Sequence, residues 1–414
     1  MKILLVNYRY FISGGPEKYM FNIKKILEEN GHEVIPFSIH SNKNIKTKYS
    51  KYFVEPIGNR DTTYYDELKK TPKVIWQLLT RSIYSFDVKR KIKEEIKDVK
   101  PDLVYIIHFV NKLSPSVISG AKEMKVPVVL RLSDYFMLCP RCDFLYNKEV
   151  CEDCLKKGYK TCIQRRCVKN SKLASLTRVV AMKIHKLINI YAKVDAFVTP
   201  SQFLKKKLIE NGYTEEKINY IPTFTVNNYK EDNKIGEYGL YFGRISVEKG
   251  IETLVKAYKE LPNYELKIMG DDTSDEAMKV KKYIKENNIR NVDFLGFKSG
   301  KELDEIIDNA RFSLIPSIWY DNLPNVALES FIHGKPVIAS NIGSLPELVE
   351  DGYNGYLFEA KNEKDLIEKI KQLDDDNLVK LMGKNSKKQL IDKFSKEKHY
   401  EKLIELFNSL TKGS

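Results

Sequence analysis

The most informative segment of this chain reads DNLPNVALE at residues 321–329 and is followed by GKPVIAS at residues 334–340. It separates two carboxylates, Asp321 and Glu329, by a turn. Pro324 suits the first turn of a helix that carries Glu329 inward, and the apolar run after the helix predicts a strand. A carboxylate on that helix can accept two hydroxyl groups at once, as a ribose requires.

The start of the same predicted helix offers a second kind of contact. The first N–H groups of a helix have no intrahelical acceptor, so those of Asn325 and Val326 can bind a phosphate. The alternative is a capped surface helix whose acids are incidental. The other segments of the chain favour the binding site.

A second segment reads YFGRISVEKG at residues 241–250. The apolar run at 239–245 predicts a buried strand, and a helix is expected from about Glu248. Arg244 and Lys249 therefore lie at the carboxyl end of a strand, where open α/β sheets bind ligands. Two cations there would neutralise a diphosphate and stabilise it as a leaving group. The alternative, two solvated basic residues, leaves their spacing unexplained.

The third segment is the N-terminus, where MKILLVN at residues 1–7 predicts a strand. SGGPE at 13–17 is a glycine turn, and the apolar spacing over 19–30 indicates a helix. The glycines do not follow the Gly-x-Gly-x-x-Gly pattern, which disfavours a nicotinamide dinucleotide.

Together these three segments resemble the GT-B glycosyltransferases, specifically the retaining enzymes of family 4. The resemblance implies an α/β GT-B fold, in which two Rossmann-like doubly wound domains face a cleft. It also implies that Asp321 contacts the transferred sugar, although the family usually has Glu there. In the same way, Gly15 would let the backbone approach the donor closely, and Gly270 and Phe297 would lie near the nucleotide base.

One position departs from the family pattern. Family members often carry His-Asp-Tyr after the strand expected near 127–132, whereas this chain has Ser133-Asp134-Tyr135. Ser133 can still donate a hydrogen bond to the donor. A retaining transfer on one face of the sugar needs electrostatic stabilisation more than a protein base, so the predicted activity survives the change.

The β/α alternation predicts an N-terminal domain at 1–225, with a cysteine-rich insert at 136–170, and a second domain at 238–392. The resemblance implies that the first is the acceptor side and the second binds the donor, and that a final helix at 393–414 crosses back to the first domain. The polar segment 226–237 is the expected linker. Six strands are expected in the second half of the chain, near 239–245, 264–270, 292–296, 312–317, 336–340 and 355–359, which indicates a doubly wound parallel sheet.

The chain has 414 residues, a formal net charge of +14 and no apolar run long enough to span a membrane. We expect a cytoplasmic protein with an anionic partner.

Eleven Lys and Arg residues, and no acid, lie within 154–194. The same region contains an apolar helical stripe: Leu173, Leu176, Val180, Ile184, Leu187 and Tyr191. Such a helix either packs its apolar face on the core and exposes its basic face to solvent, or rests on an anionic membrane surface. Nucleic acid is disfavoured because no binding motif accompanies the charge.

All six cysteines lie between residues 139 and 167. A cytosolic protein is expected to lack structural disulfides. Two Cys-x2-Cys pairs, Cys139 with Cys142 and Cys151 with Cys154, have the spacing of a structural zinc site. A redox-sensitive staple and six free thiols are the alternatives. No catalytic metal is expected, because the chain has no Asp-x-Asp sequence of the metal-dependent type near a strand end.

The sequence thus predicts a retaining glycosyltransferase that uses a UDP- or GDP-linked sugar. The acceptor would be a glycan or a polyprenyl-lipid-linked molecule, in the synthesis of cell-surface polysaccharide, with the enzyme peripheral to the inner face of the plasma membrane. The alternatives are another GT-B activity, such as an epimerase or a phosphorylase, and a non-catalytic basic or zinc-binding scaffold.

Overall fold

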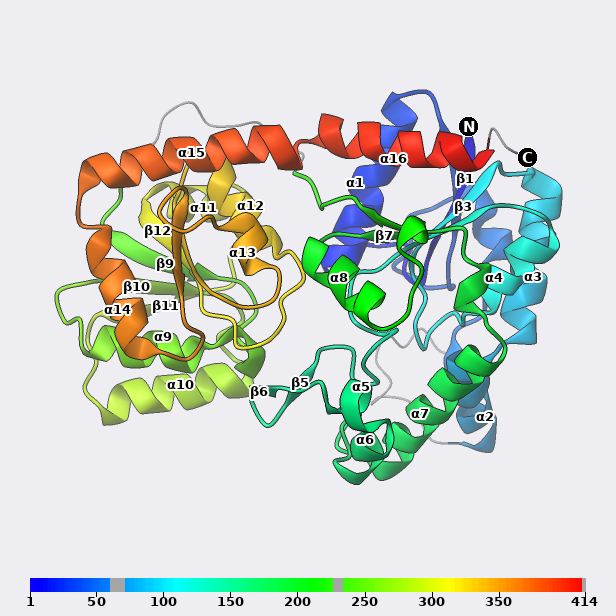
Figure 1. The fold of residues 1–414 in the computed structure, drawn as a ribbon, viewed down its shortest axis with the longest axis horizontal. Helices are drawn as coiled ribbons and strands as arrows, with labels where there is room; N and C mark the ends of the chain where they lie inside the picture. The colour runs from blue at the N-terminus through cyan, green and yellow to red at the C-terminus, as the bar shows by residue number, and fades with distance from the viewer. Residues whose placement is uncertain (60–70, 226–233, 412–414) are drawn as a thin grey trace.

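The protein is described by a computed structural model that covers residues 1–59, 71–225 and 234–411. These residues form two α/β domains that lie side by side (Figure 1). Each domain is built on a parallel sheet of six strands. The predicted α/β class with two doubly wound sheets is confirmed. The expected linker at 226–237 lies mostly outside the described residues.

The first sheet has one crossover of strand order near its middle. Across the sheet its strands are β2 (Glu33–Phe37), β1 (Lys2–Asn7), β3 (Leu103–His108), β4 (Val128–Arg131), β7 (Ala196–Thr199) and β8 (Ile218–Tyr220). These strands are apolar almost throughout because helices cover both faces. Strand β8 was not predicted, since it has only three residues.

The second sheet follows the order of a dinucleotide-binding fold. Across the sheet its strands are β11 (Val292–Gly296), β10 (Leu266–Met269), β9 (Tyr238–Phe242), β12 (Ala310–Ile315), β13 (Val337–Ser340) and β14 (Gly355–Phe358). Each overlaps a predicted strand, and the ends differ by at most three residues, as for β9 against the predicted 239–245. Continuous apolar runs between turn signals make such buried strands readable from sequence.

Helices cover both sheets. Those before the second sheet are α1 (Gly15–Glu29), α2 (Pro72–Ile83), α3 (Phe86–Val99), α4 (Ser116–Glu123), α5 (Asp153–Lys157), α6 (Lys160–Gln164), α7 (Lys172–Leu187) and α8 (Gln202–Glu210). Those after its first strand are α9 (Ile251–Lys259), α10 (Asp275–Glu286), α11 (Lys301–Asp308), α12 (Asn325–Ile332), α13 (Leu345–Leu348), α14 (Glu363–Gln372), α15 (Asp376–Phe394) and α16 (Lys396–Thr411). Short 3-10 helices include η4 (Tyr191–Lys193), η5 (Glu215–Lys217) and η6 (Val247–Lys249).

The last two helices join the domains. Figure 1 shows α15 beside the second domain and α16, in the same line, beside α1 of the first. Leu403 and Phe407 of α16 are buried in the core of the first sheet. The final helix therefore belongs to the first domain by packing, although it follows the second in sequence.

The cysteine-rich insert reaches toward the second domain. Its hairpin, β5 (Leu145–Tyr146) with β6 (Glu149–Val150), carries Lys148, whose Nζ lies 2.8 Å from Glu252 of α9. Glu149 of the hairpin pairs with Lys361 of the second domain. Among the described residues, no helix has the length and hydropathy needed to cross a bilayer.

Candidate active site

Several of the predicted site residues lie near the point where strand order reverses in a sheet. In the second sheet this point lies between β9 and β12, and in the first between β1 and β3. Crossovers leave such neighbouring strands in opposite directions, which opens a crevice at their carboxyl ends. The segments that follow β9 and β12 carry Arg244, Lys249 and Asp321.

Lys249 and Asp321 form an ion pair inside this crevice. The Lys249 ammonium is bonded to the Asp321 carboxylate, and Ser317 Oγ donates a hydrogen bond of 3.0 Å to the same oxygen. The Lys249 side chain is 16% exposed and that of Asp321 8%. The ring of Trp319 lies 5.5 Å from Lys249 Nζ. Each of these two mostly buried charges is stabilised by the other, because water screens the pair little.

A glycine turn brings Lys249 to this position. Gly250 has φ 71°, and a Cβ there would lie 1.8 Å from the carbonyl oxygen of Pro316. Only glycine permits both the left-handed backbone and this close approach. The turn after β9 is therefore held against the chain that leaves β12.

Arg244, the second predicted cation, points elsewhere. Its side chain is largely exposed, and its guanidinium lies 3.4 Å from the carboxylate of Glu248. The structure thus separates the two cations that the sequence grouped. Lys249 is fixed by a buried acid, whereas the exposed Arg244 pairs, among the described residues, with the carboxylate of Glu248 alone and can turn toward a ligand.

Glu329 faces the first domain across the crevice. Its Oε1 accepts a hydrogen bond of 2.9 Å from Lys18 of α1, and both side chains remain partly exposed. Asn325 and Glu329 line a small cavity with Lys18. Val326 is next to Asn325 at the start of α12, as predicted from Pro324.

The loop before α12 is held by Ser344. Ser344 Oγ donates to the carbonyl oxygen of Asp321 at 2.7 Å and accepts from the N–H of Leu323 at 2.6 Å. Leu323 has φ 53°, an uncommon conformation for a branched side chain. This backbone therefore positions both Asp321 and the N-terminus of α12.

The three other predicted donor contacts differ in their surroundings. A Cβ at Gly15, the first residue of α1, would meet nothing within 4 Å, so space remains there for a ligand. A Cβ at Gly270 would lie 2.2 Å from the carbonyl oxygen of Gly243. Gly270 is therefore required for close packing of two turns. Phe297 presents an exposed ring at the end of β11.

Ser133 lies at the carboxyl end of β4, beside His108 and Asp134 in a narrow cavity. His108 ends β3, and burial lowers its pKa below the ordinary value, which Asp134 partly opposes. Its imidazole is therefore uncharged at neutral pH. Sequence reasoning found Ser133 through the family pattern and missed His108, because no motif marks it.

Lys18, Ser317 and Trp319 were also missed. Each contacts a predicted residue that is distant in sequence or lies in an irregular loop. Lys18 lies between the predicted glycine turn at 13–17 and the predicted helix at 19–30, where a lysine carries no signal. Their contribution is visible only from the fold.

The two domains also touch beside the site. Ser201 Oγ at the start of α8 donates to Asn322 Oδ1 at 2.8 Å. Glu347 of the second domain accepts from the N–H groups of Gln202 and Phe203 at 2.7 and 2.6 Å. These bonds use the free N–H groups of a helix N-terminus and fix the width of the crevice.

The cysteines lie in the insert, between residues 139 and 167. Burial raises the pKa of Cys139 to about 11 and that of Cys142 further. The thiol of Cys162 instead contacts those of Cys154 and Cys167, which lowers the pKa of Cys154. Within the ranges that the structure covers, no three His, Cys, Asp or Glu side chains are arranged as metal ligands. Among the described residues Cys139, Cys142, Cys151 and Cys154 are thus not brought together as a ligand set, and a structural zinc at these cysteines stays a prediction.

Residues 227–389 match the family model of glycosyl transferases group 1. An uncharacterised glycosyltransferase of Methanocaldococcus jannaschii, MJ1178, is 32% identical over 51% of this chain and 57% of its own length. An uncharacterised 42.6 kDa protein in the cps region of Klebsiella pneumoniae is 26% identical over 91% of this chain and 94% of its own. The lipopolysaccharide 1,2-N-acetylglucosaminetransferase of Salmonella typhimurium is 28% identical over 48% of this chain and 58% of that enzyme.

Solved structures share the fold over the whole chain. Sucrose-phosphate synthase from Thermosynechococcus elongatus superposes with a TM-score of 0.71 at 19% identity, covering 100% of both chains. Anabaena Alr3699/HepE in complex with UDP-glucose superposes with a TM-score of 0.66 at 17% identity, covering 99% of this chain and 100% of its own. The chain therefore has the GT-B fold of these solved structures, and residues 227–389 match the model of glycosyl transferases group 1.

Proposed function

We propose that this chain transfers a sugar from a nucleotide-sugar donor to an acceptor, with retention at the anomeric carbon, as a family 4 enzyme. The observation that carries the proposal is the convergence of Lys249, Asp321 and Glu329 at the point where strand order reverses. In this arrangement Lys249 would bind the diphosphate, Asp321 the transferred sugar and Glu329 the ribose.

In the proposed reaction the bond between the anomeric carbon and the diphosphate oxygen breaks as the acceptor oxygen bonds to that carbon. The leaving phosphate takes the proton of the acceptor hydroxyl. Lys249 stabilises the charge that develops on the diphosphate, and Arg244 turns in from solvent to join it. Glu329 accepts the ribose hydroxyls after exchanging its bond with Lys18.

The acceptor side is formed by the first domain. Ser133 donates a hydrogen bond toward the reacting sugar, and the uncharged His108 beside it orients an acceptor hydroxyl. Because the phosphate receives the proton, neither residue acts as a base. The second domain thus supplies the electrostatic stabilisation of the leaving group, and the first domain positions the acceptor.

We propose UDP as the nucleotide, with GDP as the alternative, because HepE of similar fold was solved with UDP-glucose. The acceptor is a glycan or a polyprenyl-lipid-linked glycan of the cell surface. The partial likeness to a lipopolysaccharide N-acetylglucosaminetransferase supports this class of acceptor. No catalytic metal is required, since lysine and arginine neutralise the diphosphate.

We also propose that the enzyme is cytoplasmic and docks on the inner face of the plasma membrane through α2 and α7, which pack together (Figure 1). The apolar stripe of α7 faces outward: Leu173 is 73% exposed and Leu187 81%. Trp76 of α2 adds a ring that is 68% exposed. We name this surface, with Lys172, Lys183 and Lys186 at its edges, the α2–α7 face. Apolar side chains flanked by lysines suit an anionic bilayer.

The test is a screen of nucleotide sugars for slow hydrolysis by the purified protein, with Lys249→Ala as the control. We expect one donor to be hydrolysed, with release of the nucleoside diphosphate, and the control to lose that activity. Hydrolysis of no donor, or equal hydrolysis by the control, contradicts the proposal. An optical or NMR assignment of the released anomer tests retention.

A further inference from the structure

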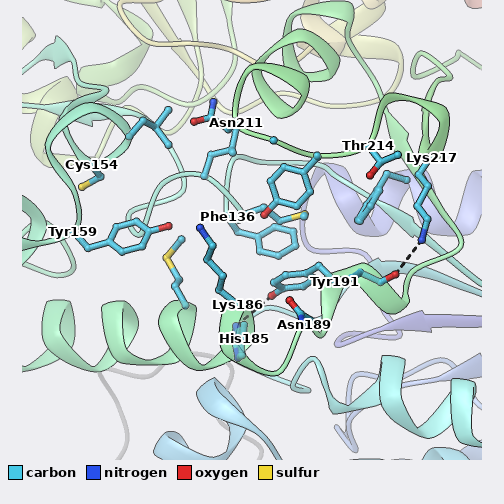
Figure 2. A pocket seen from close by; sticks show the side chains of 18 residues that line it. Phe136, Cys154, Tyr159, His185, Lys186, Asn189, Tyr191, Asn211, Thr214 and Lys217 are labelled. Atoms are coloured by element: carbon cyan, nitrogen blue, oxygen red, sulfur yellow. Dashed lines mark hydrogen bonds between the residues drawn. The ribbon is translucent and has the colours of Figure 1, made fainter.

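A cavity of about 590 Å³ lies in the first domain, beneath α7 and apart from the donor site (Figure 2). Its walls are mainly apolar and aromatic, and include Phe136, Leu155, Tyr159, Met182 and Tyr213. This volume is typical of sites that bind small molecules. A cavity of this size with such walls favours an apolar ligand body.

The charged groups at the cavity are all basic. None of the described residues that line it is Asp or Glu. Lys217 donates to the carbonyl oxygens of Ala192 and Val194, so its bonds are used by the fold. Lys186 is exposed, and Figure 2 shows it extending from α7 into the cavity. An ammonium at the edge of an apolar cavity suits an anion that carries an apolar chain.

His185 does not supply a second charge. Its Nε2–H donates to the carbonyl oxygen of Ile83 at 2.7 Å, and burial lowers its pKa to about 4. The imidazole therefore stays neutral and serves to join α7 to α2. Among the described residues that line the cavity, Lys186 is therefore the cation whose ammonium is not used in hydrogen bonds within the fold.

The cavity lies between the reaction crevice and the α2–α7 face. Phe136 lines it and also lines the narrow cavity of Ser133 and His108. On the other side, Lys186 is followed in sequence by the exposed Leu187 and Ile188. A ligand whose anionic group meets Lys186 would therefore lie in a cavity that also reaches Phe136 and, through it, the acceptor wall.

We propose that this cavity binds the isoprenoid chain of a lipid-phosphate acceptor, with the phosphate at Lys186. The inference rests on the proposed function, because it assigns the acceptor of that same reaction. It places the apolar part of the acceptor beneath α7 and directs its glycan past Phe136 toward the crevice.

The test measures binding of geranylgeranyl phosphate to the full chain by equilibrium dialysis, below the concentration at which the lipid forms micelles and without any donor. We expect saturable binding, and none of inorganic phosphate. Met182→Trp should lower the affinity at least tenfold by filling the cavity. Lys186→Gln should lower it roughly tenfold, the effect of losing a charge-assisted hydrogen bond.

Two further variants control the test. Ala192→Trp also fills the cavity but starts from an exposed residue, so it gives the answer if Met182→Trp does not fold. Lys193→Gln removes an exposed lysine of η4 that neither lines the cavity nor belongs to the α2–α7 face, and binding should be unchanged. Absence of binding, or equal binding by both tryptophan variants, overturns the proposal.

Dihexanoyl phosphatidic acid distinguishes an acceptor lipid from a membrane phospholipid. We expect it to bind at least tenfold more weakly, and equal binding would overturn the assignment to the acceptor. The outcome is separate from that of the proposed function. Lipid binding without donor hydrolysis would contradict only the transfer reaction, and hydrolysis without lipid binding would contradict only this site.

Discussion

Replacing Lys249 should damage both catalysis and stability, for two different reasons. As the diphosphate leaves, Lys249 supplies a fixed charge in a crevice that water screens little. Removal of one such donor typically lowers kcat by about 10²–10³. We therefore expect Lys249→Met to lose turnover by that factor.

The stability effect follows from the buried partner. In Lys249→Met the Asp321 carboxylate, 8% exposed, keeps only the hydrogen bond from Ser317. Breaking a buried pair on one side costs about 3–5 kcal/mol. For a domain of this size about 3 kcal/mol corresponds to a fall in Tm of roughly 6–12 °C.

A double variant separates the two effects. In Lys249→Met with Asp321→Asn the uncompensated charge is gone, so most of the lost Tm should return while turnover stays low. Calorimetric melting and donor turnover are measured on the same four proteins: the parent, both single variants and the double variant. Near-normal turnover of Lys249→Met would remove this lysine from the site, and an unrestored Tm would show that the ion pair is not the cause.

Three other predictions follow from separate parts of the chain. Glu329→Ala should weaken binding of the free nucleoside diphosphate about tenfold or more by titration calorimetry, because a charged hydrogen-bond acceptor is lost; unchanged affinity would place the ribose elsewhere. Glu95 is fully buried, neither carboxyl oxygen has a partner among the described residues, and burial raises its pKa to about 9. The unfolded chain releases this proton near pH 4.5, whereas the folded chain keeps it until about pH 9. The free energy of unfolding therefore falls as the pH rises between these two values. Glu95→Gln should therefore raise Tm more at pH 8 than at pH 5, and an equal shift at both would show that Glu95 does not titrate in this way. Lys183→Glu should reduce co-sedimentation with anionic vesicles at low salt, since each surface charge contributes about 1 kcal/mol, and an unchanged bound fraction would exclude α7 from docking.

The sequence predicts the sheets well because parallel strands buried on both faces are continuous apolar runs. Strand β8 is too short to give such a run, and the hairpin β5–β6 has two residues in each strand. The insert carrying this hairpin shows its cysteines in the sequence but not its contacts with Glu252 and Lys361. Those contacts depend on how the two domains face each other.

In the candidate site, too, the local features are visible in the sequence and the contacts between distant segments are not. The spacing of Asp321 and Glu329 is local, and so it is visible in the chain. The partners of these acids come from distant segments: Lys249 reaches Asp321 through the turn at Gly250, and Lys18 reaches Glu329 from the other domain. Residue type and spacing thus indicate what the site binds, whereas only the fold shows which groups hold each other before the ligand arrives.

The orientation of α7 shows why a periodic pattern cannot settle a helix's surroundings. A stripe at helical spacing indicates one apolar face and does not say what that face meets. Packing on the core, the first of the two alternatives, would put the stripe inside. The inward side instead carries His185 and Arg178, whose guanidinium donates to the carbonyl oxygen of Phe136 at 2.9 Å. A buried arginine bonded to a carbonyl is retained only where the fold supplies that acceptor, because the unpaired charge would be costly. The polar contacts beneath α7 therefore fix its rotation and leave Leu173, Leu176 and Leu187 outside. A helix turned this way exposes apolar area with no partner in the described chain, which is the physical ground for placing a membrane against it.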